Sequence, residues 1–237
     1  MSINISVITP TIRPKGLPIV EKALKRQVGC SFEWLVGSKF FPKVHCQHVK
    51  DVFKGGYWTL NRMYNSLIEA SIGELIVSWQ DFTYADPDCL HKFWTHYQNN
   101  KKSLVSAVGN KYADKTWSAI TWQDPRERSD MGSFYEVYPN DIEWNLCACP
   151  KKALYEIGGF CELFDFNFFG MDGYGVNERL NELGYKFYLD QTIKSYSLEH
   201  NRPSGWNKHN GLDGGYSKIR DRLKSERKWP KMSYLGI

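Results

Sequence analysis

The sequence predicts an α/β domain with a mostly parallel sheet that helices cover on both faces. Over the first 110 residues, short apolar stretches alternate with amphipathic helix patterns. The chain has 237 residues, which is long enough for one substantial core. It is 42% hydrophobic and 24% charged, and no apolar run reaches the length of about 18 residues that a membrane span needs. Disordered and membrane-spanning classes are therefore excluded.

The first strand, helix and strand follow one another at the N-terminus. Residues 3–9 are rich in β-branched residues, and Pro10 ends the expected strand. Pro18 favours a helix start and Gly29 a helix end. A second apolar strand is expected at residues 32–37. The helix residues expected to face the core are Ile19, Val20, Ala23, Leu24 and Val28.

The next helices and strands continue the alternation. A stripe at helical spacing predicts a helix that ends at Gly73. Strands are expected at residues 75–79 and 104–108, with a helix opened by Pro87 between them. Ligands of such sheets gather beyond the carboxyl ends of the strands, so these ends are where a site is sought. The stripe of the helix that ends at Gly73 consists of Leu60, Met63, Tyr64, Leu67 and Ile68.

The second half of the chain is less regular. Residues 111–145 lose the alternating pattern and accumulate aromatic residues, which is typical of a binding loop or lid. Regular structure is expected again as helices at residues 151–157 and about 177–183. Strands are expected at residues 186–189 and 193–198.

Three acids follow the strand at residues 75–79. Asp86 and Asp88 flank a proline at a helix start, where Asp is favoured as a cap. Asp81 comes directly after the strand, where a hard oxygen ligand can hold Mg²⁺ or Mn²⁺ against a diphosphate. Asp81 is therefore the candidate metal ligand.

Cysteine usage and charge suggest a setting for the protein. The N-terminus has no basic segment followed by an apolar one, so no secretory signal is expected. The six cysteines include no Cys-x-x-Cys pair and are typical of free thiols, so a cytoplasmic location is expected. The net charge of +5 is concentrated near residues 218–231, a pattern usual for a solvated helix face and less common for a surface that binds a polyanion.

Four segments together resemble a known family. They are SVITPTIRP at 6–14, FEWLVG at 32–37, YNSLIEASIGELIVSWQDF at 64–82 and IGGFCELFDFNFFGMDGYGVNERLNELGYKF at 157–187. In this order they resemble GT-A fold glycosyltransferases of the inverting family-2 type, and the last resembles the galactosyltransferase-type C-terminal segment of that group. The resemblance implies a GT-A (nucleotide-diphospho-sugar transferase) fold with a mostly parallel central sheet flanked by helices.

The resemblance also implies how the chain is divided. Residues 1–237 would form a single glycosyltransferase domain. Residues 1–110 would bind the nucleotide sugar, residues 111–210 would form the acceptor and catalytic half, and residues 211–237 would be a basic C-terminal helix or tail. The positions that match donor-binding residues of the family are Pro10, Thr11, Arg13, Asn65, Gln80 and Asp81.

The metal site implied by the resemblance differs from the usual pattern. The family commonly has two acids separated by one residue, whereas this chain has Gln80-Asp81-Phe82. Asp81 is the implied ligand of Mn²⁺ or Mg²⁺. His200 matches a position where many GT-A enzymes place a metal-binding histidine, with His209 as the alternative. The family also places an Asp that contacts the base where this chain has Gly37-Ser38-Lys39.

The catalytic and acceptor residues follow from the C-terminal segments. Gly170-Met171-Asp172-Gly173 resembles a family segment whose carboxylate is the general base, so Asp172 is the predicted catalytic residue. A base is needed because the pKa of a hydroxyl lies far above that of a carboxylate. A turn residue between glycines is the alternative for Asp172. Trp144 and Asn145 match acceptor-contacting positions, with a core position as the alternative for Trp144.

These features predict an enzyme that moves a hexosyl or pentosyl group from a nucleotide sugar to an acceptor hydroxyl, with inversion and with metal assistance. A UDP-sugar is the expected donor. A glycan is the first expectation for the acceptor, and a protein or a hydroxymethylated DNA base is the alternative. A non-catalytic module that binds a nucleotide sugar or a glycan is a further alternative, because Gln80-Asp81-Phe82 lacks the usual second acid.

Overall fold

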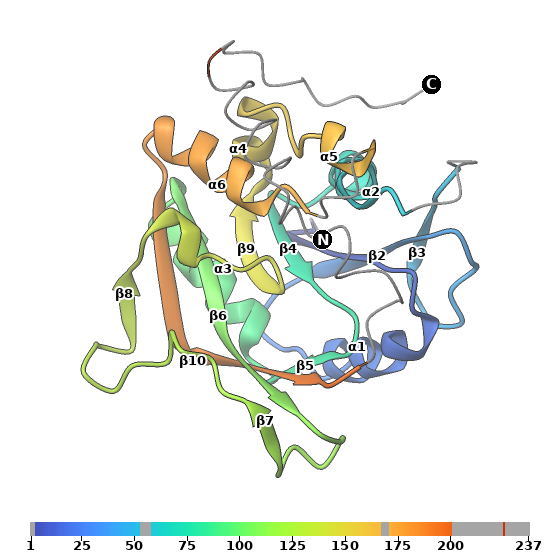
Figure 1. Ribbon diagram of the computed structural model, residues 1–237, viewed down its shortest axis with the longest axis horizontal. Coiled ribbons are helices and arrows are strands. Elements are labelled where there is room, and N and C mark those ends of the chain that lie inside the picture. Colours follow the sequence, from blue (N-terminus) through green and yellow to red (C-terminus); the bar gives the residue numbers. More distant parts are fainter. Residues whose placement is uncertain (1–2, 53–57, 167–170, 201–224, 226–237) are drawn as a thin grey trace.

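The computed structural model describes residues 3–52, 58–166, 171–200 and 225 (Figure 1). The strands are β1 (Ile5–Pro10), β2 (Phe32–Ser38), β3 (Gln47–Lys50), β4 (Leu75–Trp79), β5 (Thr83–Ala85), β6 (Ser103–Tyr112), β7 (Ile120–Trp122), β8 (Phe134–Glu136), β9 (Leu146–Pro150) and β10 (Lys186–Leu198). The helices are α1 (Leu17–Leu24), α2 (Leu60–Ala70), α3 (Cys89–Asn99), α4 (Lys151–Glu156), α5 (Leu163–Phe166) and α6 (Gly173–Glu182), with short 3-10 helices η1 (Pro14–Gly16) and η2 (Pro139–Asp141).

One mixed sheet organises these elements. Its order is β3-β2-β1-β4-β9-β6-β10-β5, with β7 paired to β6 and β8 paired to β10. The strands from the first 80 residues, β3, β2, β1 and β4, are parallel to one another. All six residues of β1 are buried, as expected for a central strand with both faces covered. The predicted α/β fold, with a central sheet flanked by helices, is confirmed, but the sheet is mixed rather than mostly parallel, because β5, β7, β8 and β9 pair antiparallel to their neighbours.

Two apolar clusters cover the two faces of the sheet. On one face, Val20 of α1 and Phe93 of α3 pack against Val7 of β1. On the other face, α2, α4 and α6 pack against Ile8 of β1 and Ile76 of β4. Figure 1 shows α2, α4 and α6 on one side of the sheet and α1 on the other.

The helix α1 is shorter than the sequence pattern predicts. It ends at Leu24, and Val28, expected to face the core, is 59% exposed. The other four residues of the expected stripe are buried. The backbone N–H of Val28 instead donates to the carbonyl of Pro87, 3.0 Å away, so the chain after α1 is tied to the segment just before α3.

The strand β9 is the main element that the sequence pattern does not reveal. It lies between β4 and β6 and runs antiparallel to both, with Trp79 opposite Leu146 and Val105 opposite Ala148. It joins the parallel N-terminal half to the pair β6 and β10, which is parallel again. The two strands expected at residues 186–189 and 193–198 form one strand, β10, with an irregularity in its pairing between Asp190 and Lys194.

A search of the described residues for a helix long and apolar enough to cross a membrane finds none. His209, Gly170 and, except for residue 225, the predicted basic tail at 211–237 lie outside the described residues.

Candidate functional site

The predicted donor residues Thr11, Arg13 and Asp81 meet at one edge of the sheet. Because β1 and β4 are parallel neighbours, the segments that follow them emerge side by side. Thr11 Oγ1 donates a hydrogen bond to Asp81 Oδ2. The Arg13 Nε donates to the same oxygen over 3.0 Å, and its Nη2 donates to Oδ1. The carboxylate of Asp81 is therefore buried under a two-point contact with a guanidinium.

Local backbone geometry holds this cluster together. Phe82 has a φ of 61°, an uncommon conformation for a non-glycine residue, which turns the chain sharply after Asp81. Gly16 packs against Phe82 so closely that an added Cβ would lie 2.5 Å from the ring and 2.7 Å from the backbone nitrogen. The Arg13 guanidinium lies 5.4 Å from the centre of the Phe82 ring. The loop after β1 and the loop after β4 thus pack as one unit.

The other three predicted donor-binding residues, Pro10, Gln80 and Asn65, make other contacts than those of the Asp81 cluster. Pro10 is the buried last residue of β1, and its neighbour Thr11 begins the cluster. Gln80 is half-buried, and its N–H donates to the carbonyl of Asn145 over 2.9 Å. Asn65 is fully buried in α2, where its amide exchanges hydrogen bonds of 2.8 and 2.9 Å with the backbone of Phe160. The contacts of Asn65 bind α2 to the segment before α5.

His200 packs against Phe82, the same ring that the Arg13 guanidinium contacts. The two rings of His200 and Phe82 stack with centres 5.0 Å apart. The Nδ1 of His200 lies 3.0 Å from the carbonyl of Leu198, so with the proton on Nδ1 its Nε2 carries the lone pair. Burial lowers the pKa of His200, and nearby Arg13 lowers it further, so the imidazole is neutral, as a metal ligand must be.

The donor types of Asp81 and His200 fit a divalent cation. A carboxylate and a neutral imidazole suit Mn²⁺, and Mg²⁺ commonly takes one or two carboxylates and completes its shell with substrate phosphates and water. No cluster of three or more His, Cys, Asp or Glu side chains suited to a metal occurs among the described residues. A cation held here would therefore depend on oxygen atoms of the nucleotide for its remaining ligands.

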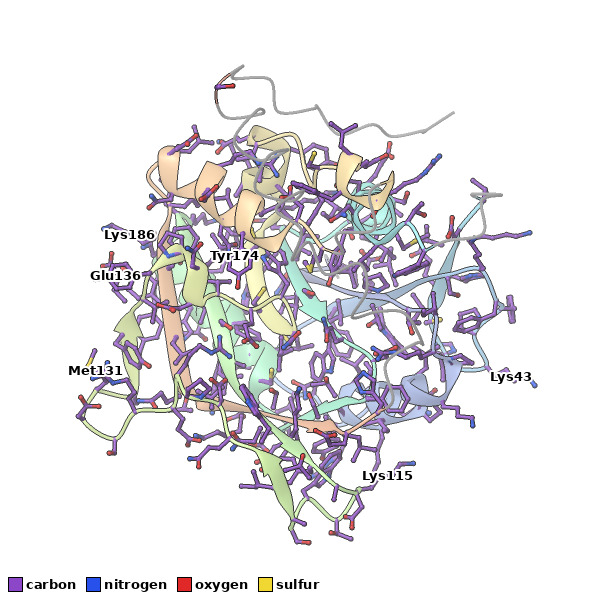
Figure 2. The ribbon with its side chains drawn as sticks, in the orientation of Figure 1. Lys43, Lys115, Met131, Glu136, Tyr174 and Lys186 are labelled. Carbon is purple, nitrogen blue, oxygen red and sulfur yellow. The ribbon has the colours of Figure 1, made fainter. Side chains whose placement is uncertain are left out.

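A cleft of about 540 Å³ has on its wall residues that bond to the chain neighbours of Asp81, although Thr11, Arg13 and Asp81 do not line it themselves. Asn145 on its wall is bonded to Gln80, and Ser197 on its wall lies 2.9 Å, hydroxyl to hydroxyl, from Thr83. The cleft therefore adjoins the chain on both sides of Asp81. Several lining residues come from the aromatic-rich segment at 111–145 and from the start of α6: Lys111, Trp122, Arg126, Glu143, Gly173 and Tyr174. Figure 2 shows Tyr174 beside the start of α6.

Asp172, the predicted general base, is fully buried at the N-terminus of α6. Its Oδ2 accepts hydrogen bonds from Arg179 Nη2 at 2.7 Å and from the N–H of Cys161 at 2.9 Å. Its Oδ1 faces Gly175, where an added Cβ would lie only 2.1 Å away. Burial raises the pKa of Asp172 to about 6, although the nearby Arg179 opposes this shift. Its neighbours Met171 and Gly173 line the cleft, whereas the carboxylate is directed into the protein.

Of the two predicted acceptor residues, Trp144 lies in the core and Asn145 is exposed. The Trp144 indole is 4% exposed, packs against Tyr64 and Phe160, and donates its N–H to Asn177 over 3.1 Å. This environment corresponds to the core alternative considered for Trp144, although part of the residue borders the cleft. Asn145 is available to a ligand.

A buried polar network that the sequence reasoning missed connects Asp172 to α2. Asp165 accepts hydrogen bonds of 2.9 Å from the backbone N–H groups of Asn61 and Arg62, and so caps the N-terminus of α2 from 104 residues away. The side chain of Asn61 links Asp165 to the N–H of Asp172 over 2.9 and 2.7 Å. Such long-range contacts leave no local sequence signal. Arg179 could have been sought as the partner of an acid seven residues earlier.

Comparison with known proteins identifies the fold. No protein-family model matches the chain, and no curated protein matches it in sequence. A crystal structure of GalNAc-T7 with UDP, GalNAc and Mn²⁺ matches with a TM-score of 0.64 at 9% identity, over 98% of this chain and 55% of that one. Two crystal structures of S. aureus TarS, one of them limited to residues 1–349, match with TM-scores of 0.58 at 12% identity, over 83% of this chain.

These neighbours are glycosyltransferases, and the chain has their GT-A fold. The fold predicted from the four sequence segments is thereby confirmed. The chain spans only 55% of the GalNAc-T7 structure and 37% and 60% of the two TarS structures.

Proposed function

We propose that this protein is a glycosyltransferase that moves a sugar from a nucleotide sugar to an acceptor hydroxyl with inversion. The observation that carries the proposal is the convergence of Thr11, Arg13 and Asp81 at the ends of two parallel strands beside a cleft. Ligands of α/β sheets bind at such strand ends. A buried acid and a half-buried guanidinium there suit the phosphate groups of a nucleotide and their counter-ion.

The proposed donor is a UDP-sugar, and the proposed cofactor is Mn²⁺ or Mg²⁺. The GalNAc-T7 structure contains UDP and Mn²⁺, which supports both proposals by analogy of fold. Asp81 and His200 would hold the cation, and when bound it would supply positive charge to the diphosphate leaving group. Arg13 supplies a second positive charge on the same side and orients Asp81.

Asp172 is the proposed general base. The raised pKa of about 6 supports this role, because a base works best when its pKa lies near the pH of the reaction. In the role, the carboxylate leaves its ion pair with Arg179 and turns toward the cleft that Met171 and Gly173 line. The acceptor proton passes to Asp172 as the acceptor oxygen bonds to the anomeric carbon, and the bond to the diphosphate breaks with its electron pair on the phosphate.

The acceptor is proposed to be a glycan, with a protein side chain or a hydroxymethylated DNA base as the alternative. The polar cleft wall at Asn145 supports a hydroxyl-bearing acceptor of any of these kinds. A cytoplasmic location stays a prediction, with the free state of all six cysteines in its support.

The function is tested by incubating the protein with Mn²⁺, a panel of nucleotide sugars and candidate acceptors, followed by mass spectrometry. The proposal expects a mass increase of one sugar residue on an acceptor, or release of nucleoside diphosphate from one donor. Absence of binding, hydrolysis and transfer with every donor would contradict it.

A second candidate is a non-catalytic module that binds a nucleotide sugar. The contacts of Asp81 favour it, because Arg13 and Thr11 already occupy both carboxylate oxygens in a strand end with a single acid. Donor binding without hydrolysis or transfer in the same experiment would select this candidate over the enzyme.

A further inference from the structure

Glu143 is a cleft acid with no role in the function proposed so far. Its side chain is 44% exposed and lines the cleft beside the Asp81 cluster. The other acid on that wall, Asp141, is committed to the backbone, since it accepts a hydrogen bond from the N–H of Tyr138 at 3.1 Å. In the described part of the chain, Glu143 Oε1 makes no hydrogen bond that would compete with a ligand, whereas Oε2 accepts one from Asn145 Nδ2 at 2.8 Å.

Glu143 lies beside the guanidinium of Arg126. The Arg126 Nη2 lies 3.6 Å from Glu143 Oε2 and 2.5 Å from Asp124, which is buried. Arg126 Nη1 also donates to the carbonyl of Asp141 over 2.8 Å, and Asp124 accepts the N–H of Gly109 at the end of the buried part of β6 over 3.0 Å. The carboxylate is thus supported by a guanidinium that is itself fixed to the sheet. Preorganisation of this kind favours a binding group over a solvated surface acid.

The position of Glu143 relates it to the transferred sugar rather than to the nucleotide. Asn145, to which Glu143 is bonded, is tied through its backbone to Gln80, next to Asp81. The sugar of a donor is bonded directly to the diphosphate, so a diphosphate at Asp81 brings that sugar to the wall formed by Glu143 and Asn145. A carboxylate accepts hydrogen bonds from sugar hydroxyls, and an amide both accepts and donates them.

We infer that Glu143, positioned by Arg126 and Asn145, binds hydroxyl groups of the sugar that is transferred and determines which sugar is accepted. This inference rests on the proposed function. Glu143 acts here in recognition, and the proton transfer assigned to Asp172 is separate from it. A hydrogen bond to a charged group discriminates strongly against a sugar that lacks or misplaces the hydroxyl.

The test compares Glu143→Gln with the wild type in calorimetric titrations with Mn²⁺. The ligands are the nucleoside diphosphate that the wild type binds best and a set of its sugar conjugates that differ at single hydroxyl positions. The matched control is Glu136→Gln: Glu136 is 53% exposed, is ion-paired with Lys186 at 2.8 Å and does not line the cleft. Figure 2 labels both residues. Both acids are exposed enough for the amide variant to fold.

The inference expects Glu143→Gln to bind the nucleoside diphosphate as the wild type does and to bind the preferred sugar conjugate about tenfold more weakly. The variant should also distinguish less between the sugar conjugates, and Glu136→Gln should behave as the wild type. Wild-type affinity for the conjugate, or an equal loss of affinity for the free diphosphate, would each overturn the inference while leaving the proposed function standing. If the wild type bound no nucleotide, the proposed function itself would fail.

Discussion

Asp81 has one structural role and one proposed functional role. It accepts hydrogen bonds from Thr11 and Arg13, and it is the proposed ligand of a divalent cation. Its position directly after a buried apolar strand made it predictable from the sequence. Its contacts with Thr11 and Arg13 were not predicted, since the resemblance named these two residues only as donor-binding positions and they lie 70 and 68 residues away in the chain.

Removal of the charge at Asp81 tests the metal proposal. Asp81→Asn should weaken UDP binding in the presence of Mn²⁺ at least about tenfold, because a contact of a charged group contributes roughly 1.5–3 kcal/mol. Binding measured by calorimetry in EDTA should change much less. Asp88→Asn is the control, since Asp88 is a 48% exposed acid of the same sequence stretch that pairs with Lys92. Equal losses with and without Mn²⁺ would count against a metal at this site.

Substitution of Asp172 tests whether this residue acts in catalysis or only in folding. Asp172→Asn should lower sugar transfer by about 10²–10⁴-fold, the usual contribution of a general base, while donor binding is retained. Arg179 loses its charged partner in this variant, while burial favours a neutral side chain at this position, so the two effects on the free energy of unfolding oppose each other.

The control for Asp172 is Asp165→Asn, a change of another buried acid in the same region whose contacts are to α2. Transfer is measured at a temperature where both variants are folded. A transfer rate in Asp172→Asn equal to that of the wild type would remove the base assignment, and an equal loss in Asp165→Asn would assign the effect to structure.

Among the helices and strands, those with a long and regular hydrophobic pattern could be predicted from the sequence, and those with a short or irregular pattern could not. The helix α2 begins at Leu60, the first residue of the predicted stripe, and ends at Ala70, before the Gly73 that was predicted as its end. The strand β9 was missed because it has only five residues, of mixed type, which form no clear strand pattern. Its pairing with β4 also joins positions about 70 residues apart. The strands β5, β7 and β8 were missed because three residues are too few to form a pattern.

The cap of α2 makes the stability of the protein depend on pH. Burial raises the pKa of Asp165 to about 7, above the value near 3.9 of an unfolded Asp. The folded state therefore binds a proton more strongly than the unfolded state between these pH values, and the stability that this provides is present at low pH and lost as pH rises through 7. Asp172, with a pKa raised to about 6, acts in the same direction.

We expect the free energy of unfolding of the wild type to fall from pH 5 to pH 8 by more than that of Asp165→Asn, measured by urea denaturation. The difference between the two proteins isolates Asp165 from the other titrating groups. A pH dependence that is the same in both would show that Asp165 titrates alike in the folded and unfolded states.

For the whole molecule, the sequence predicted the central sheet and the donor-binding residues near Asp81. The cleft could be recognised only in the three-dimensional structure. Glu143, Arg126 and Trp122 lie in the segment at 111–145 that was predicted as a binding loop or lid, without individual roles. Their meeting depends on β9 and β10, which bring the second half of the chain beside the Asp81 strand end. A pattern of hydrophobic periodicity holds no information on such distant contacts.

The GT-A fold and the Asp81 cluster together make nucleotide binding the central claim. The most direct measurement is a calorimetric titration of the protein with UDP and other nucleoside diphosphates in the presence of Mn²⁺. The account predicts saturable binding of one nucleoside diphosphate per chain, weakened by Asp81→Asn. Failure to bind any nucleoside diphosphate, or binding that Asp81→Asn leaves unchanged, would contradict it.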